Sequence, residues 1–504
     1  MLKKSHKIWV AIAIIMVVVI SASAISLAVD YIDGNENPVN MLVTNATEDC
    51  KTSVNVTWHS PVNKCTIAYT YADDTSFADA VVVEVEGVAG TVDYYDQAAG
   101  TYYKYAYTIT GLTEDTKYIY KVYNDMGSSS VYSFVTAGTN AFRFIAIGDS
   151  HVSKASNKII YLPQMTNILN NIESKIGSWD LIIHTGDHTY TGATYNNWVQ
   201  YNDSKLTSSG ILAMTIGNHE TDDRNGTGTK KISDKWFVNA LGNPTNGPMN
   251  IESVYWFNYN GVLFLCLNSL STETKEFDIF KKDFGFQTSW MQDVVAAQEG
   301  KFQYIVVYQH YPLGNGSDDN FCDYSYYSKL YQVCDELGVD FVLGGDSHEY
   351  SRSKRLYNNE VVADDGDKGT VYVTNSMITE GTVNSVTKGA AGSLCATRIS
   401  GGATGSLVFT VTENAITMQL VNADATVIDE TTVPSRRTAV VTGTEVTAPN
   451  TAPTPTPAPT EAPTTEPAGH EDGKNNTTII VVIAAAVVVV GGAAGAMVFL
   501  KKKK

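Results

Sequence analysis

Cysteine is scarce in this sequence, and its cysteines are poorly spaced for metal binding. Six occur in 504 residues, and no two form a C-x-x-C motif. This spacing argues against a cysteine-based metal site. In an exported chain these residues would lie on the oxidising side of the membrane, where six cysteines allow fifteen disulfide pairings. The sequence does not choose among those pairings.

Basic residues are also few. The chain has 35 Lys and Arg against 53 Asp and Glu, a formal net charge of −18. Seven of the basic residues lie at the two extreme ends, so residues 8–500 carry 28 basic and 53 acidic side chains, a formal charge of −25. An acidic surface repels phosphate backbones, and we therefore expect no nucleic-acid binding.

Proline is sparse except in one stretch near the C-terminus. Residues 442–476 hold seven of the 14 prolines, mixed with Thr, Ala and Glu. A segment of this composition cannot bury a core, and we expect an extended stalk there.

An apolar stretch near the N-terminus predicts export. Ile8–Ile20 follows three lysines and precedes an Ala-x-Ala pattern at residues 22–24, which is typical of a signal peptide over residues 1–24. The alternative is an uncleaved anchor, because apolar residues continue to Val29.

A second apolar stretch lies near the C-terminus. Ile479–Leu500 has no charged residue and is followed by four lysines, residues 501–504. This pattern predicts a membrane-spanning helix with a short cytoplasmic tail. Together the two stretches predict an ectodomain held at the cell surface or extracytoplasmic face by one C-terminal helix.

Two kinds of pattern divide the rest of the chain. From residue 38 to 138, short alternating runs separated by turn residues predict an all-β sandwich. From 140 to 433, apolar strands alternate with helical patterns, which predicts a layered α/β domain. We expect its helices at Ile159–Ile176, Ser289–Ala297 and Tyr326–Leu337.

Five polar clusters in this second domain each follow an apolar run. The runs predict buried strands at Phe142–Ile147, Leu181–Ile183, Ile211–Ile216, Tyr304–Val307 and Phe341–Leu343. The side chains that follow them are Asp149 and His151, Asp187 and Tyr190, Asn218 and His219, His310, and Asp346 and His348. Because ligands gather outside the carboxyl ends of such strands, we expect these side chains at one rim.

These residue types predict a site for two metal ions. A carboxylate has two oxygens, and Asp187 is placed to bridge two cations. Further oxygen and nitrogen ligands come from Asp149, His151, Asn218, His310, Asp346 and His348. Two metals about 3.5–4 Å apart lower the pKa of a bridging water and clamp a phosphoryl group. His219 could donate a proton to the leaving oxygen or stabilise charge on the phosphoryl group.

The clusters, in this order, resemble the calcineurin-like metallophosphoesterase superfamily. With the N-terminal sandwich, the chain is more closely similar to the purple acid phosphatases over residues 38–430. The family pattern is Gly-Asp-x-(Gly/His), Gly-Asp-x-x-Tyr, Gly-Asn-His-(Asp/Glu), Val-x-x-His and Gly-His-x-His. Its counterparts here are Asp149, Asp187 with Tyr190, Asn218 with His219, Val307 with His310, and His348.

The resemblance implies a fold and a cofactor. The fold would be a fibronectin-type-III-like sandwich followed by an α/β domain, in which a layered β-sandwich is flanked by helices. The cofactor would be two divalent or di/trivalent metal ions, drawn from Fe, Mn and Zn. The substrate would be a phosphorylated small molecule or another phosphoester.

Two positions depart from the family pattern. The chain carries both His151 and Tyr190, whereas the broader superfamily uses the His and purple acid phosphatases use the tyrosinate. We favour His151, because a neutral imidazole binds a metal at less cost than a phenol with a pKa of about 10. Asp346 stands where the family has a histidine. It would make the second site harder and favour Mn²⁺, Fe²⁺ or Mg²⁺ over Zn²⁺, or it would weaken that site.

Four further residues near the clusters receive an interpretation. Glu220 and Arg352 are expected to support the metal ligands through hydrogen bonds. His184 lies inside a strand and is expected to be a core histidine. His188 could touch substrate, but we expect it to face solvent.

The sequence leaves more than one function open. The leading hypothesis is a membrane-anchored phosphatase that hydrolyses phosphate monoesters through a metal-activated water. The alternatives are a phosphodiesterase acting on nucleotides or lipid head groups, and a surface binding protein on a degenerate phosphatase scaffold.

Overall fold

The computed structural model describes most of the chain between residues 39 and 452. The described residues are 39–155, 158–160, 162–202, 204–221, 233–270, 286–314, 324–375, 378, 392–399 and 404–452. The predicted signal peptide, the stalk beyond residue 452, the predicted membrane helix and the tail all lie outside these ranges. No helix within the described ranges has the length and apolar character needed to cross a bilayer.

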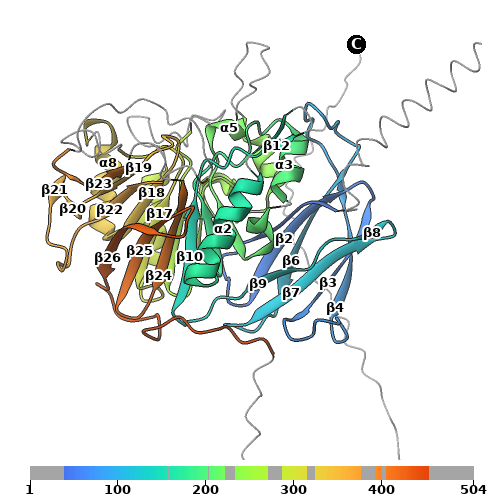
Figure 1. The fold of residues 1–504 in the computed structure, drawn as a ribbon, viewed down its shortest axis with the longest axis horizontal. Coiled ribbons are helices and arrows are strands. Elements are labelled where there is room, and N and C mark those ends of the chain that lie inside the picture. The colour runs from blue at the N-terminus through green and yellow to red at the C-terminus, as the bar shows by residue number, and fades with distance from the viewer. Residues whose placement is uncertain are drawn as a thin grey trace, which may run out of the picture. The chain divides into compact units, whose positions relative to one another are not determined.

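The N-terminal domain is built from strands, as the alternating pattern predicted (Figure 1). They are β1 (Asn40–Asn45), β2 (Ser53–Ser60), β3 (Lys64–Tyr71), β4 (Val81–Glu86), β5 (Val88–Ala89), β6 (Tyr103–Thr110), β7 (Lys117–Asn124), β8 (Gly127–Ser128) and β9 (Tyr132–Val135). Antiparallel pairing joins β1, β2 and β6 on one side and β4, β3 and β7 on the other. In the core, the ring of Trp58 stacks on that of Tyr105 with centroids 4.8 Å apart.

Two sheets carry the second domain. Within the described ranges, the larger sheet has ten strands in the order β26-β25-β24-β10-β13-β14-β1-β2-β6-β5. Its strands after the sandwich are β10 (Phe142–Ile147), β13 (Leu181–His184), β14 (Ile211–Met214), β24 (Gly405–Val411), β25 (Ala415–Asn422) and β26 (Val427–Pro434).

The smaller sheet has seven strands in the described part of the chain, in the order β15-β16-β17-β18-β22-β19-β23. They are β15 (Tyr255–Tyr259), β16 (Val262–Cys266), β17 (Tyr304–Tyr308), β18 (Phe341–Gly344), β19 (Tyr350–Ser353), β22 (Val371–Thr374) and β23 (Cys395–Ile399). Short hairpins pair β11 (Ser153–Ala155) with β12 (Lys158–Ile160), and β20 (Leu356–Tyr357) with β21 (Glu360–Val361).

Alternate residues of these strands point into different layers of the core. Phe144 of the larger sheet meets Phe264 of the smaller sheet edge to face, with ring centroids 5.2 Å apart. Phe341 meets Phe409 in the same way at 5.3 Å. Ile145, which follows Phe144, belongs instead to the cluster that includes the apolar face of a helix. The sheets therefore pack face to face with helices outside, which confirms the predicted layered α/β architecture.

Helices cover the outer faces of both sheets (Figure 1). The long ones are α2 (Leu162–Ile176) on the larger sheet, and α7 (Gln287–Ala297) and α8 (Tyr324–Leu337) on the smaller. The short ones are α3 (Tyr195–Asn202), α4 (Lys205–Ser208), α5 (Asn218–Thr221), α6 (Lys235–Ala240) and the 3₁₀ turn η1 (Pro248–Asn250).

The start of α2 differs from the prediction. The helix expected from Ile159 begins only at Leu162, because residues 158–160 pair with β11 as a strand. Two adjacent isoleucines fit either pattern, whereas Pro163 is well suited to a first helical turn.

The two domains share the larger sheet. β1 lies parallel to β14 with Asn45 opposite Leu212, and its other edge pairs with β2. The Ala46 N–H also donates to the Leu212 carbonyl at 3.2 Å. One strand thus continues the α/β sheet and begins the sandwich.

After β26 the chain returns to the sandwich. Arg436 and Arg437 both pair with the buried carboxylate of Asp340, which precedes β18. Farther on, the Lys117 N–H donates to the Asn450 carbonyl at 2.7 Å. Residues 442–452, where we expected the stalk to begin, therefore include backbone that pairs with the first domain.

The described cysteines are all unpaired. Cys50, Cys65, Cys266, Cys334 and Cys395 are buried free thiols. Cys322 lies outside the described residues. None of the pairings that the sequence left open therefore forms among these five.

Candidate metal centre

Strand ends from both sheets meet at one rim. β10, β13 and β14 are parallel neighbours in the larger sheet, and β17 and β18 are parallel neighbours in the smaller. His310 Nε2, after β17, lies 3.4 Å from Asp187 Oδ1, after β13. The Asp346 N–H, after β18, donates to both carboxylate oxygens of Asp149, after β10, at 3.1 Å. These contacts cross from one sheet to the other.

The backbone at these strand ends is strained. Five predicted ligands have φ values between 45° and 66°, in the left-handed region: Asp149, His151, Asp187, Asp346 and His348. They make up five of the 14 non-glycine residues with positive φ in the described chain. This conformation costs about 1–3 kcal/mol per residue and gathers at active sites and ligand clamps.

Glycines allow the strand ends to approach each other. A Cβ on Gly217 would lie 2.2 Å from the backbone nitrogen of Asp187. Gly186 has a φ of 97°, and a Cβ there would lie 2.5 Å from His310 Nδ1. Only glycine fits at these two positions without displacing a predicted ligand.

One group of ligand atoms is compact enough to surround a single cation. Asp149, His151, Asp187 and His348 each offer one atom, and these four atoms all lie within 4.8 Å of one another. His151 Nε2 is 3.2 Å from Asp187 Oδ2, and His348 Nε2 is 3.4 Å from Asp149 Oδ1. Carboxylate and imidazole donors suit a divalent transition metal.

A second group shares Asp187. His310 Nε2 lies 3.4 Å from Asp187 Oδ1, 2.9 Å from Asn218 Oδ1 and 3.6 Å from Asp346 Oδ1. Asp187 therefore directs one carboxylate oxygen to each group. This is the arrangement that a bridging ligand between two metal ions requires.

At Asp187 and His310, neighbouring charge outweighs burial in setting the pKa. Burial alone would raise the pKa of Asp187, but His310 and His151 outweigh it and hold that pKa well below its usual range. Burial alone would lower the pKa of His310, but Asp187 and Asp149 raise it to about 9. The carboxylates thus favour positive charge between them, which fits bound cations.

His219 turns one nitrogen toward the cluster. Its Nδ1 lies 2.7 Å from the Tyr190 carbonyl and must donate to it, because a carbonyl only accepts. Its Nε2 then lies 3.7 Å from Asp187 Oδ2. The ring is buried beside that of His151, with centroids 4.4 Å apart. This position is consistent with the predicted role of His219 as a proton donor.

Tyr190 reaches the rim without being enclosed by it. Its side chain is 49% exposed, and its ring centroid lies 5.4 Å from that of His219 and 6.4 Å from that of His151. His151, by contrast, is only 4% exposed and contacts Asp187. Of the two alternative ligands, His151 is therefore the one that lies inside the cluster.

Glu220 braces the loops that carry the ligands. Its Oε2 accepts from the N–H groups of Asp187 and Gly217, both at 2.9 Å, and its Oε1 accepts from Thr189 at 3.1 Å. The carboxylate also faces His188 Nδ1 at 3.4 Å, and both side chains are fully buried. Glu220 therefore fixes the backbone around Asp187 relative to the backbone at Gly217.

Arg352 makes its polar contacts elsewhere. Its guanidinium forms a two-point ion pair with Asp429, at 2.6 Å and 2.9 Å. The Tyr350 hydroxyl donates to the same carboxylate at 2.6 Å. Arg352 thus ties β19 of the smaller sheet to β26 of the larger. Its hydrogen bonds among the described residues do not reach the metal-ligand candidates.

The prediction for His188 was wrong. We expected it to face solvent, but it is 0% exposed and stacks on His184 with centroids 4.0 Å apart. The rings of Trp198 and Tyr201, both on α3, lie 6.0 Å and 5.6 Å from it. Helix α3 follows the Gly186–Tyr190 motif in the chain and covers His188. His184 is a buried core histidine, as expected.

One orienting group had no signal in the sequence. The carbonyl oxygen of Thr185 accepts a hydrogen bond from His310 Nδ1 at 2.7 Å. This bond turns His310 Nε2 toward the ligand cluster and fixes its tautomer. Every residue has a carbonyl, so only the fold could reveal this role.

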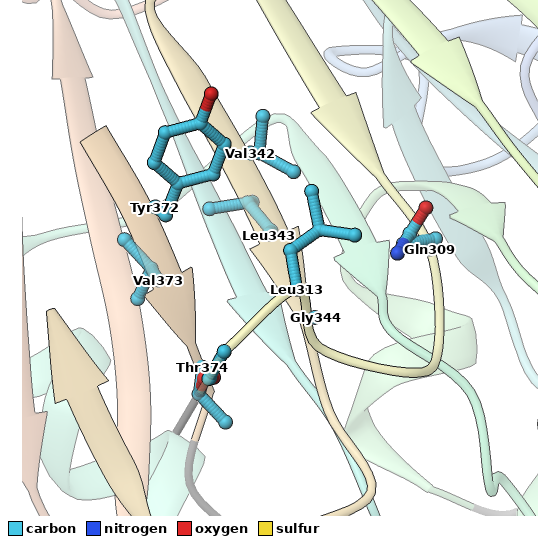
Figure 2. Close-up of a pocket in the computed structure, with 9 residues that line it drawn as sticks. Gln309, Leu313, Val342, Leu343, Gly344, Tyr372, Val373 and Thr374 are labelled. Atoms are coloured by element: carbon cyan, nitrogen blue, oxygen red, sulfur yellow. The ribbon is translucent and has the colours of Figure 1, made fainter. Parts of the chain in front are cut away.

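A crevice beside the rim is too narrow to bind a ligand. It lies at the ends of β17, β18 and β22, with Gln309, Leu313 and Tyr372 on its walls (Figure 2). The space between these side chains does not admit a water molecule. We therefore assign the crevice no substrate.

Comparison with known protein families agrees with this geometry. Residues 142–350 match the family model for the calcineurin-like phosphoesterases, and residues 38–136 match that for the purple acid phosphatase N-terminal domain. The chain thus joins a purple acid phosphatase N-terminal domain to a calcineurin-like phosphoesterase domain. It is a metal-dependent phosphoesterase of the class that uses a binuclear metal centre.

Solved structures share the two-domain fold. The purple acid phosphatase PPD1 from yellow lupin (Lupinus luteus) seeds has a TM-score of 0.60 and 15% identity, over 82% of this chain and 78% of its own. The structure of PhoD has a TM-score of 0.53 and 12% identity, over 76% of this chain and 86% of its own. At such low identity the likeness concerns the fold alone, and it confirms the predicted fold class.

Proposed function

We propose that the protein is a phosphatase that hydrolyses phosphate monoesters at the extracytoplasmic face of a membrane. The observation that carries the catalytic part is the Asp187 carboxylate, with one oxygen in each of two ligand groups. The resemblance to purple acid phosphatases supports the preference for monoesters.

The residues divide the work as follows. Asp149, His151 and His348 would hold one cation together with Asp187, while Asn218, His310 and Asp346 would hold the other. Two metal ions bound there would supply positive charge for the phosphoryl group and would lower the pKa of a water molecule. His219 keeps Nε2 directed at the reacting group, because the Tyr190 carbonyl holds its Nδ1–H. From that position the doubly protonated ring would give its Nε2 proton to the leaving oxygen and keep the Nδ1–H.

Asp346 sets the metal preference in this proposal. Asp346 gives the second site a carboxylate where the family has a histidine. Hard oxygen ligands favour Mn²⁺ or Fe²⁺ over Zn²⁺. We expect elemental analysis of the purified protein to find Mn or Fe. An Asp346→His variant should shift the bound metal toward Zn²⁺. Unchanged metal content in that variant would argue against this role of Asp346.

Membrane anchoring is proposed from the sequence of the C-terminal stretch. The charge-free residues 479–500 and the four lysines after them support a single spanning helix. The full chain should stay in the membrane fraction after an alkaline wash, whereas a chain ending at Asn476 should be released. Release of both chains would remove the anchor from the proposal.

The catalytic proposal is tested on the full chain with an aryl phosphate monoester and the matching diaryl diester. We expect faster hydrolysis of the monoester. Asn218→Ala and His219→Ala should abolish most of that activity, while the exposed Asn414→Ala should leave it intact. Hydrolysis that persists unchanged in both site variants would overturn the proposal, and a faster reaction on the diester would make the protein a phosphodiesterase.

A further inference from the structure

Tyr190 is an exposed aromatic side chain at the rim of the metal centre. Its backbone is held on both sides: the N–H donates to the Val152 carbonyl at 3.0 Å, and the carbonyl accepts from His219 Nδ1 at 2.7 Å. The ring is 49% exposed, whereas His151 and His219 beside it are buried. A fixed backbone therefore presents a half-exposed ring next to the proton donor.

The ring meets its two neighbours edge on. It makes an angle of 64° with the His219 ring at 5.4 Å, and of 67° with the His151 ring at 6.4 Å. Among the described residues, its hydroxyl makes no hydrogen bond. A phenolate that ligates a metal is drawn into the cluster and loses its water, but half of this side chain faces solvent. His151 Nε2 already occupies the position 3.2 Å from Asp187 Oδ2.

We propose that Tyr190 determines substrate specificity by stacking on a flat aromatic leaving group. This inference rests on the proposed phosphatase function. The leaving oxygen must approach His219 Nε2 to receive a proton, so the group attached to that oxygen lies beside the neighbouring Tyr190 ring. A planar aromatic group covers the open face of the tyrosine, whereas a puckered aliphatic ring of the same size covers it poorly.

The size of the effect follows from the strength of aromatic pairs. Stacking of two aromatic rings adds to the effect of burying their surface. The added stacking lowers the dissociation constant by about 3- to 10-fold. That factor should appear in KM, because Tyr190 contacts the leaving group and not the reacting phosphorus. It should appear only for esters whose leaving group is flat.

Two esters isolate this contact. Benzyl phosphate and cyclohexylmethyl phosphate both leave as primary alkoxides of similar size, and only the first carries a flat ring. For the full-length wild type we expect a KM for benzyl phosphate about 3- to 10-fold below that for cyclohexylmethyl phosphate. Tyr190→Ala should remove most of this ratio. Tyr190→Phe should retain the ratio and the wild-type metal content, because it keeps the ring and loses only the hydroxyl.

The controls separate stacking from other roles. Tyr357→Ala changes a tyrosine on the hairpin of β20 and β21 and should leave the ratio of KM values unchanged. Circular dichroism and the melting temperature confirm that each variant is folded. A Tyr190→Ala variant that raises both KM values equally would overturn the inference. So would a Tyr190→Phe variant that loses bound metal, because the hydroxyl would then be a ligand. Wild type that hydrolyses neither ester would overturn the proposed function and this inference together.

Discussion

Two fully buried histidines in this molecule show opposite acid–base behaviour. His310 lies at the metal rim, where Asp187 and Asp149 outweigh burial and raise its pKa to about 9. His59 lies between the domains, where burial and the nearby ammonium of Lys104 lower its pKa to about 3. Since burial is complete at both positions, the sign of the neighbouring charge decides the outcome. The rim favours positive charge on its histidine, whereas the region around His59 keeps the imidazole neutral.

The region around His59 connects the sandwich to the site. His59 Nε2 lies 3.0 Å from the Asn239 carbonyl at the end of α6, and its ring stacks on Tyr102 at 4.8 Å. The Lys104 ammonium donates to two more carbonyls there, those of Val238 and Leu241. The sandwich therefore caps the C-terminus of α6.

That helix reaches the layer beneath the ligands. Its Phe237 ring lies 5.8 Å from the ring of His188, and His188 faces the Glu220 carboxylate. The first domain therefore supports the metal centre from below, through hydrogen bonds to backbone carbonyls and packing, without contributing a predicted ligand. The comparison predicts that changes at the rim abolish chemistry, whereas changes in the region around His59 alter stability.

The largest effect is expected from Asp187→Asn. The amide keeps the size of the carboxylate but cannot offer an anionic oxygen to each ligand group. We expect loss of bound metal and a fall in kcat/KM on the order of 10³-fold or more. Elemental analysis and steady-state kinetics check this outcome, with the exposed Asp424→Asn as the matched control. Full metal occupancy in Asp187→Asn would remove the bridging role.

Lys104→Met should mainly reduce stability. It removes the donor for two carbonyls at the end of α6, which are left poorly solvated, and the cost is about 2 to 3 kcal/mol of unfolding free energy. Urea denaturation measures this change. Lys64→Met removes an exposed ammonium and should leave the unfolding midpoint unchanged. Equal midpoints for Lys104→Met and the wild type would show that capping by the sandwich does not hold α6.

His59 should make stability depend on pH. Its imidazole stays neutral in the folded protein down to about pH 3, whereas in the unfolded chain it binds a proton below about pH 6.5. Its contribution is therefore fully present above that pH and is lost as the pH falls toward 3. Between about pH 7.5 and about pH 5 the loss is about 2 kcal/mol.

His59→Gln tests this dependence because glutamine does not titrate. In urea denaturation, the stability gap between wild type and His59→Gln should shrink by about 2 kcal/mol over that pH range. A Tyr102→Phe variant keeps the histidine and should retain the wild-type slope. Parallel pH profiles for wild type and His59→Gln would contradict the low pKa.

Arg352→Met is expected to have the smallest effect. It breaks the pair with Asp429, whose two side chains are only 12% and 9% exposed. Because Asp429 keeps the hydroxyl donors of Tyr350 and Thr397, we expect a cost of about 1 kcal/mol. Because the hydrogen bonds of Arg352 do not reach the described metal ligands, bound metal should stay at the wild-type level. Loss of metal in this variant would restore the supporting role that the sequence suggested.

Much of the rim was predictable because buried parallel strands have continuous apolar sequences. Phe142–Ile147 was predicted with the bounds that β10 has, and the strand before His310 extends only one residue farther than expected. The polar residues after such strands must lie near the carboxyl edge of the sheet. The sequence positions of these polar residues were therefore enough to predict that they lie close together.

Other features depend on contacts that a linear pattern does not encode. His188 is buried because α3 folds over it, and a histidine after a strand fits either environment. Arg352 has the sequence position expected of a residue that supports the metal ligands. In the structure it pairs instead with Asp429, 77 positions away. The pairing of β1 with β14 joins residues about 170 positions apart, and nothing local distinguishes it from a free strand edge.

That last pairing has a practical consequence for anyone dissecting the protein. A fragment beginning near Asn140 would contain every predicted metal ligand, yet the side of β14 that β1 normally occupies would be bare. Exposed strand edges recruit other chains and promote aggregation. The shortest soluble enzyme should therefore begin before β1, and a catalytic fragment cut at the apparent domain boundary should precipitate.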